Sequence, residues 1–234
     1  MKIDNAHERL NSLWGRIDER HNSLIAEKLR GKRILDIGCG YGSLVNYLVA
    51  RGFEAEGWDH DPESVAVAHE LFPGVPVKHV DAEREATMPA NTFDSVVLKD
   101  SLHHLAGEGD VDVSFANIRR LLKPGGRIVI LDPNPMPILR VARKLARHHD
   151  PEATSTFALR LLKEQGFTVG GIRYHETIGL PLSGGYVGVR FVPNVRPLNA
   201  LVSWANDALS RVANAAGVGA SVCWRYVIHA DARA

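Results

Sequence analysis

Residues 34–44 constrain the fold more strongly than any other part of this chain. They read Ile-Leu-Asp-Ile-Gly-Cys-Gly-Tyr-Gly-Ser-Leu, an apolar run that breaks into alternating glycines and then becomes amphipathic. This order predicts a strand, a tight turn and a helix, because Gly38, Gly40 and Gly42 allow positive φ and a close approach of backbone N–H groups to a ligand. A helix that begins at the turn would direct its N-terminus at the same ligand, so the stretch indicates a cofactor site.

The spacing of the glycines separates two kinds of cofactor. Dinucleotide-binding domains use GxGxxG, with an acid about 20 residues later. The loop here is GxGxG, and Asp36 precedes it. A carboxylate in the loop would repel a pyrophosphate, whereas it suits a ligand that carries an ammonium or a sulfonium group. A nicotinamide-dependent reductase stays open as an alternative, although the chain has no Tyr-x-x-x-Lys sequence.

Residues 35–42 resemble the first motif of the class I S-adenosylmethionine-dependent methyltransferases. Residues 111–131 form a second pattern that is frequent in that family: an amphipathic segment, a Leu-Lys-Pro-Gly-Gly turn and an apolar run. The resemblance implies a Rossmann-like α/β three-layer sandwich with a seven-stranded, mostly parallel sheet and an antiparallel last strand. It also implies S-adenosylmethionine as the cofactor and methyl transfer as the activity.

Length and composition fit one domain of this kind. The 234 residues suffice for one well-buried α/β domain with an elaboration, and they are few for two domains. The 28 basic and 27 acidic side chains give no overall charge that would attract nucleic acid. We expect a soluble, cytoplasmic protein, because no apolar run approaches the length of a membrane span or of a signal peptide. Two cysteines, Cys39 and Cys223, are too few for a disulfide framework or a metal cluster.

Hydrophobic periodicity predicts the remaining elements of the sheet and its helices. Asp61 is expected to cap the second helix after the glycine loop or to belong to the site, and Ser155 or Thr156 to cap the helix before the sixth strand. The expected strands are residues 34–37, 53–58, 75–80, 91–98, 127–131, 167–174 and 222–230, and the expected helices are 44–51, 64–71, 111–122 and 155–165.

Two further segments extend this predicted core. Residues 1–30 read as a helical arm, in which Trp14 and His21 would be lid residues over the acceptor or would belong to a helix that caps the sheet. Residues 178–220 form an apolar insertion before the last strand. The insertion has four open roles: a roof over a hydrophobic acceptor with Tyr186 as a contact, a homodimer contact, a peripheral membrane contact, or packing on the domain's own core.

The resemblance assigns cofactor contacts at the ends of successive strands. Asp36 and the glycines would surround the methionine part, Asp59 would hold the ribose hydroxyls, and Asp81 would accept a hydrogen bond from the adenine amino group. The complete expected set is Asp36, Gly38, Cys39, Gly40, Gly42, Asp59, His60, Asp81, Ala82 and Lys99.

Candidate catalytic residues follow the fourth strand. Methyl transfer to a hydroxyl or an acidic carbon requires a base, and histidine titrates in the useful pH range. His103 and His104 lie where ligands bind in open α/β sheets, so we expect one of them to be the base. Asp100 and Asn134 are expected to orient the acceptor.

The acceptor itself is expected to be a small hydrophobic molecule, such as a lipid, a quinone or a natural-product intermediate, methylated on O, N or C. The apolar insertion motivates this expectation, together with a basic amphipathic helix at residues 138–149 that suits a membrane surface, an acidic substrate or solvent. The chain lacks the Asn-Pro-Pro-Tyr run of adenine and amide N-methyltransferases and a carboxylate set for a magnesium-bound catechol. A non-catalytic binding module of the same fold stays open.

Overall fold

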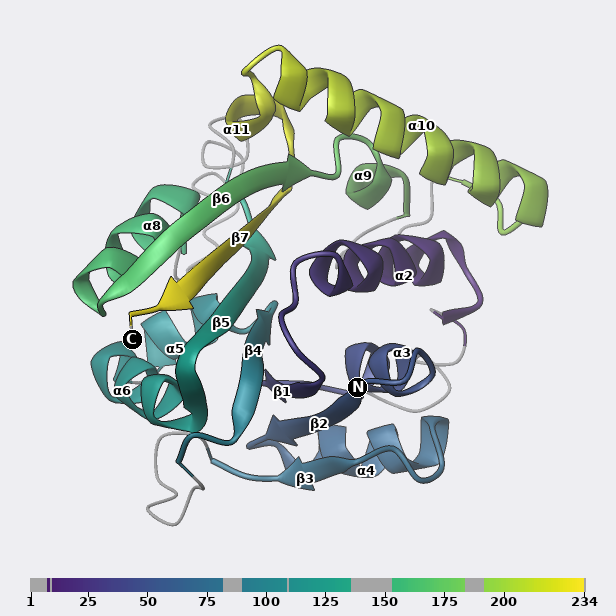
Figure 1. Cartoon of the computed structure of the whole chain (residues 1–234). Coiled ribbons are helices and arrows are strands. Elements are labelled where there is room, and N and C mark those ends of the chain that lie inside the picture. Colours follow the sequence, from purple (N-terminus) through teal and green to yellow (C-terminus); the bar gives the residue numbers. More distant parts are fainter. Residues whose placement is uncertain are drawn as a thin grey trace.

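A twisted β-sheet between two layers of helices forms the body of the protein, as a computed structural model shows (Figure 1). The structure describes residue 8 and residues 10–81, 90–108, 110–135, 153–183 and 192–233. Within these residues, seven strands form one sheet in the order β3-β2-β1-β4-β5-β7-β6. The predicted fold class and the antiparallel last strand are confirmed.

The first five strands of the sheet run parallel, and β7 is inserted antiparallel between β5 and β6. Both faces of the sheet are covered, so the central strands are apolar on both sides. In the fourth strand, Val96 and Leu98 face one core cluster while Val97 faces the other. The strands are β1 (Arg33–Ile37), β2 (Glu54–Asp59), β3 (Val77–His79), β4 (Phe93–Lys99), β5 (Leu122–Pro133), β6 (Phe167–His175) and β7 (Arg225–Ala232).

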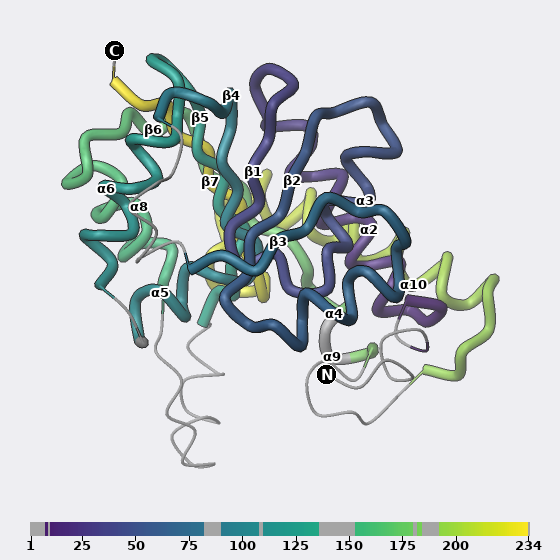
Figure 2. Tube along the Cα trace, turned by 90° about the horizontal axis from the view of Figure 1, so that it is seen from below, coloured from purple at the N-terminus to yellow at the C-terminus, as the bar shows by residue number. Residues whose placement is uncertain are grey.

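The helices divide between the two faces of the sheet (Figure 2). One face is covered by α2 (Leu13–Ala26), α3 (Ser43–Val49) and α4 (Pro62–Leu71). The other is covered by α5 (Leu102–Glu108), α6 (Val111–Leu121) and α8 (Ser155–Glu164). The helical arm predicted for residues 1–30 is therefore represented by α2, which packs against α3 and β5. The basic helix predicted for residues 138–149 lies outside the described residues.

Two local predictions need correction. Thr154, not Ser155 or Thr156, caps α8, because its backbone is still extended while its hydroxyl accepts a hydrogen bond from the N–H of Phe157 at 3.0 Å. The turn expected at residues 123–126 is instead an irregularity inside β5. The register against β4 shifts there, and Gly125 has a φ of +69°. The expected cap at Asp61 is confirmed, since its carboxylate accepts from two N–H groups of the first turn of α4.

The predicted insertion contains α9 (Gly179–Ser183), α10 (Arg196–Ala215) and α11 (Gly219–Val222). The longest of these, α10, lies across α2 and β6 (Figure 1). Its buried side is polar. Asn206 Oδ1 accepts hydrogen bonds from three consecutive N–H groups, those of residues 177–179, at 2.9 to 3.0 Å. These donors follow the edge strand β6 and would otherwise be buried without a partner.

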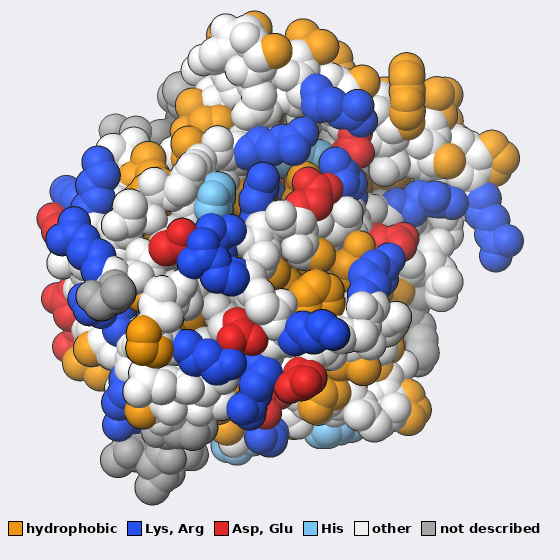
Figure 3. Space-filling view, in the orientation of Figure 1, with side chains coloured by type: hydrophobic (Ala, Val, Ile, Leu, Met, Phe, Trp, Pro, Cys, Tyr) orange, Lys and Arg blue, Asp and Glu red, His pale blue; other side chains and the backbone are white. Residues whose placement is uncertain are grey.

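The opposite side of α10 is apolar and faces solvent. Leu201, Trp204 and Val212 are 59%, 66% and 65% exposed, and hydrophobic side chains are visible along α10 in Figure 3. Packing on the domain's own core, one of the predicted roles, therefore holds for only part of the helix: Ala213 is buried, whereas Leu201, Leu209 and Val212 are exposed. The side of the helix that meets the sheet is taken by the polar residues that satisfy the backbone after β6. Within the described residues, no helix is long and apolar enough to cross a membrane.

A buried charged network joins α2 to the sheet. The guanidinium of Arg225, at the start of β7, donates to Glu176 Oε2 at 3.0 Å and pairs with Asp100. His21 of α2 lies 3.2 Å from the same Glu176 oxygen. Burial lowers the pKa of Arg225 to about 10, so it remains charged at neutral pH. Burial and the neighbouring Arg225 charge hold the pKa of His21 well below its usual value, so the ring is neutral.

Replacement of Arg225 by leucine should lower the free energy of unfolding by about 3–5 kcal/mol, because Asp100 would lose its counter-charge and the buried Glu176, whose pKa burial raises to about 8, would lose the guanidinium that donates to it. Urea unfolding at pH 7 measures this change. Arg33→Leu is the matched control, since Arg33 and its partner Glu54 are both more than half exposed; its effect should stay below about 1 kcal/mol. Equal losses in the two variants would contradict the importance of the Arg225 network.

Candidate active site

Several strand ends meet at one edge of the sheet. β1, β2, β4 and β5 end there, and the antiparallel β7 begins there, with Arg225 opposite Pro133. Ligands of open α/β sheets bind outside this edge. The glycine loop, Asp59, Lys99 and Asp132 are therefore brought to one side of the molecule, as the sequence predicts for the first three.

The glycine loop is held to the neighbouring strand through its backbone. The N–H groups of Gly38 and Cys39 donate to the carbonyl of Trp58 at 2.8 and 3.1 Å. A Cβ on Gly38 would lie 2.6 Å from the Cβ of Ser101, so close packing requires glycine at this position. A Cβ on Gly40 would meet no atom within 4 Å. The loop is thus packed on one side and open at Gly40.

Asp59 fixes the open part of this loop. Its Oδ2 accepts from the N–H of Gly40 at 2.7 Å, and its Oδ1 accepts from the N–H of Asp61 at 2.9 Å. The side chain is buried at the end of β2. Each carboxylate oxygen has a second lone pair, so these two bonds leave Asp59 able to accept further hydrogen bonds.

The other predicted contacts beyond β2 lie near Asp59. His60 is exposed, and its carbonyl lies 2.9 Å from Nε2 of His79 in β3. Val80 donates its N–H to the carbonyl of Asp59 at 2.9 Å, which places the half-buried Asp81 beside the end of β2. Ala82 lies outside the described residues.

Asp36 is a buried acid within β1. Its Oδ1 has no hydrogen-bond partner in the described part of the chain. Burial raises the pKa of Asp36 to about 7, although the ammonium of Lys99 opposes the shift, and the carboxylates of Asp59 and Asp18 raise it further. Asp36 therefore exchanges a proton near neutral pH, and a nearby cation would favour its charged form.

Lys99 makes contacts that the sequence did not reveal. Its Nζ donates to Asp18 Oδ1 and Asn22 Oδ1 at 2.6 Å each, and to Ser43 Oγ at 3.2 Å. Asp18 and Asn22 belong to α2, whereas Ser43 begins α3. An ammonium group has three N–H donors, and all three are accounted for by these bonds. These contacts join α2 to the end of β4 and the start of α3, and the predicted contact of Lys99 with the cofactor stays a prediction.

His103 and Asp132 form a second pair at this edge. His103 lies at the start of α5, and its Nδ1 is 3.0 Å from Oδ1 of Asp132, the fully buried acid near the end of β5. Burial raises the pKa of Asp132, while its contact with His103 opposes the shift. His104 is exposed, with its ring 4.2 Å from that of His103. The Asp132 carboxylate accepts a hydrogen bond from the N–H at Nδ1 of His103. The proton of the neutral ring is therefore on Nδ1, and Nε2 is the basic nitrogen.

Three of the predicted acceptor contacts have other surroundings. Asp100 is paired with Arg225. The amide nitrogen of Asn134 donates to the carbonyls of Ala220 and Cys223 at 2.9 and 2.8 Å, so it joins the loop after β5 to the start of β7. Trp14 is buried on α2. Tyr186 lies outside the described residues. These observations do not place Asp100, Asn134 or Trp14 beside an acceptor.

Sequence reasoning missed the residues that orient the predicted ones. Asp132 could have been predicted from the sequence, because it is a carboxylate at the end of an apolar strand and lies at the same edge of the sheet as His103. Asp18 and Asn22 carried a weaker one, as polar residues four positions apart on a mainly apolar side of a helix. Glu176 and Arg225 gave no signal, since their pairing depends on the antiparallel β6–β7 contact.

Comparison with known proteins agrees with this geometry. The family model of the methyltransferase domain matches residues 7–170. The ubiquinone biosynthesis O-methyltransferase of Vibrio cholerae is 28% identical over 192 residues, which cover 73% of this chain and 76% of that protein. The enzyme of the same name from Burkholderia orbicola is 37% identical over 102 residues, covering 42% and 43%. The chain thus spans less than half the length of this Burkholderia relative.

Solved structures share the fold. A methyltransferase from Archaeoglobus fulgidus aligns over 97% of this chain and 99% of its own, with a TM-score of 0.67 and 19% identity. Geranyl diphosphate C-methyltransferase from Streptomyces coelicolor aligns over 93% and 81%, with a TM-score of 0.62 and 14% identity. The family match covers most of the chain, and the glycine loop and sheet order agree with it. The chain belongs to the family of S-adenosylmethionine-dependent methyltransferase domains.

Proposed function

We propose that this protein transfers the methyl group of S-adenosylmethionine to an oxygen of a small hydrophobic molecule, with His103 as the general base. The observation that carries the proposal is the His103–Asp132 pair at the edge of the sheet where the glycine loop lies. The O-methyltransferase names of the relatives from Vibrio and Burkholderia support an oxygen acceptor.

The residues around the glycine loop fit the proposed cofactor contacts. The unpartnered Oδ1 of Asp36 suits a cationic ligand, and the space beside Gly40 suits a ligand that approaches the backbone. In the proposal, Asp36 and the loop hold the methionine part, Asp59 the ribose and Asp81 the adenine. When bound, S-adenosylmethionine supplies a methyl carbon made electrophilic by its attachment to a sulfonium.

The protein's own task in this reaction is to align the acceptor and remove its proton. A hydroxyl becomes a strong nucleophile as its proton passes to Nε2 of His103. Asp132 keeps the proton on Nδ1 and stabilises the imidazolium that forms, in the manner of an acid that orients a catalytic histidine. Because Asp132 is fully buried, its carboxylate has little solvent to compete with the histidine.

Replacement of His103 by glutamine should reduce kcat about 10²–10⁴-fold, because the acceptor proton would have no base to receive it. The dissociation constant of S-adenosylmethionine should not change. His104→Gln is the matched control, since His104 is exposed whereas Nδ1 of His103 lies 3.0 Å from the buried Asp132, and it should retain kcat within about threefold. Steady-state kinetics and calorimetry measure the two quantities. A loss in His104→Gln without a loss in His103→Gln would transfer the role to His104.

The pH dependence of cofactor binding should reveal Asp36. Its pKa of about 7 means that a proton competes with the cationic ligand below neutrality. Affinity for S-adenosylmethionine should therefore fall about tenfold from pH 8 to pH 6, because Asp36 of the ligand-free site takes up a proton over this range. Calorimetry across this range measures the slope. Asp36→Asn should bind more weakly and lose this component of the slope, whereas Asp61→Asn should keep it. An unchanged slope in Asp36→Asn would contradict the assignment.

Acceptor chemistry and cofactor class can be tested together. We expect S-adenosylmethionine and S-adenosylhomocysteine to bind about a hundredfold more tightly than NADPH. We also expect phenols with long alkyl chains to have kcat/KM values about tenfold or more above those of phenols with carboxylate or sugar substituents. Preferential NADPH binding would indicate a reductase, and faster turnover of the polar phenols would exclude the hydrophobic acceptor.

A further inference from the structure

The polarity of α10 is inverted relative to an ordinary surface helix. An amphipathic helix of a soluble domain normally directs its apolar stripe at the core. Here three of the four buried side chains are polar: Asn199, Asn206 and Ser210 are each 2% exposed, and the fourth is the small Ala213. The large apolar side chains lie along the solvent side, where Leu201 and Val212 share one line of the helix and Trp204 and Leu209 flank it. They are Leu201, Trp204, Leu209 and Val212. We call this set the outer face of α10.

The charges of α10 are also sorted. Its sole acid, Asp207, points inward and receives the guanidinium Nε of Arg20 at 2.8 Å. Its two cations, Arg196 and Arg211, are exposed. Within the described residues, neither has an ion pair with an acid. The solvent side of the helix thus combines an apolar face with positive charge.

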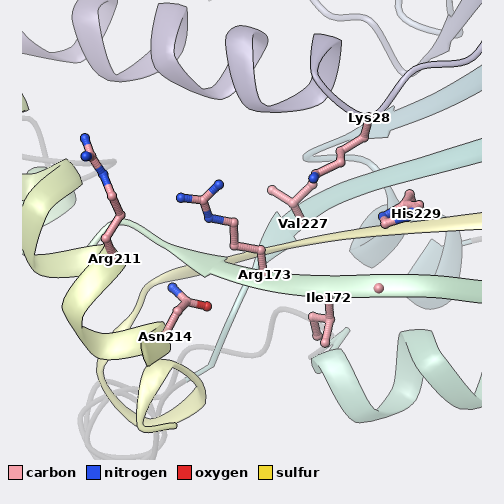
Figure 4. Close-up of a pocket in the computed structure, with 8 residues that line it drawn as sticks. Lys28, Ile172, Arg173, Arg211, Asn214, Val227 and His229 are labelled. Carbon is pink, nitrogen blue, oxygen red and sulfur yellow. The ribbon is translucent and has the colours of Figure 1, made fainter. Parts of the chain in front are cut away.

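A cationic groove adjoins the same helix (Figure 4). The groove has a volume of about 520 Å³ and lies between α10, α2 and the outer strands of the sheet. Its charged lining comes from Lys28, Arg173 and Arg211, with His229 at one end. In Figure 4, Lys28 and Arg173 extend into the space between the sheet and α2. Figure 3 shows Lys and Arg side chains gathered below α10 on this side. Positive charge therefore continues from α10 onto the groove.

We propose that α10 is an interfacial helix that seats the protein on an anionic lipid bilayer. The outer face would enter the boundary between headgroups and acyl chains, where Trp204 is well suited because its ring is apolar and its N–H is polar. Arg196, Arg211 and the cations of the groove would lie among the headgroup phosphates. Each basic residue near an anionic surface adds to binding, and the effect decreases with salt.

A bilayer explains this surface better than a second copy of the chain does. Burial of the outer face in a dimer would use the apolar side chains but would give Arg196 and Arg211 no opposite charge from α10, because Asp207 is turned inward. An anionic bilayer uses both properties at once. The inference does not depend on the proposed acceptor, since it concerns binding in the absence of cofactor and acceptor.

Vesicle co-sedimentation of the full chain tests the proposal. Vesicles of pure phosphatidylcholine and vesicles with about 30% phosphatidylglycerol should differ about tenfold or more in apparent affinity, and binding should weaken as NaCl is raised. Trp204 provides a second readout. Its fluorescence should shift to shorter wavelength on addition of anionic vesicles, and Trp204→Phe should abolish most of that shift.

Charge-matched variants separate the outer face from general effects of charge. Leu201→Glu/Val212→Glu should weaken binding about tenfold or more. Val49→Glu/Val113→Glu adds the same charge at exposed valines on α3 and α6, and it should bind within about threefold of the unchanged protein. Arg173→Gln/Arg211→Gln should lose most of the preference for anionic vesicles. Circular dichroism checks that each variant is folded.

Three results would overturn the proposal. The first is no binding to anionic vesicles by the unchanged protein. The second is equal weakening by the two double-glutamate variants. The third is a dimer, measured by light scattering, that Leu201→Glu/Val212→Glu converts to a monomer while vesicle binding is unaffected; that result would assign the outer face to a second copy of the chain.

Discussion

The buried guanidinium of Arg225 is the charge on which the active edge depends. Through Glu176 and Asp100 it joins the antiparallel β6–β7 pair to the end of β4, and through Glu176 it reaches His21 of α2. Such a group tolerates burial only with opposite charges in fixed places. The network and the Lys99 contacts together hold α2 over the edge of the sheet, where the glycine loop and the His103–Asp132 pair lie.

The fold could be predicted from the sequence where each element carries its own local signal. The glycine loop, the apolar strands and the cap at Asp61 are such signals, and the structure contains all of them. The prediction failed where a tertiary contact decided the outcome. The large apolar side chains of α10 face solvent, because Asn206 and Ser210 satisfy backbone donors after β6 on the inner side, and these donors cannot be seen in the helix's own sequence.

The candidate site also has a part that the sequence predicts and a part that it does not. Asp59 and the glycine loop could be placed at the sheet edge because a strand end fixes their position. The partners that orient them come from distant parts of the chain. Lys99 lies 81 residues from Asp18 in sequence, and His103 lies 29 residues from Asp132. Spacing within a motif carries no information about such pairs, so the contacts of Lys99 with α2 and α3 could not be predicted.

The polar side of α10 also has a consequence for how the sheet ends. An edge strand with free N–H and C=O groups is a template on which another extended chain can add. At the carboxyl end of β6, Asn214 accepts from the N–H of Tyr174 and donates to its carbonyl, at 2.9 and 2.6 Å. The opposite edge strand, β3, has only three residues. Strand addition is therefore disfavoured at β3 and at the carboxyl end of β6, where edge-to-edge aggregation would otherwise begin.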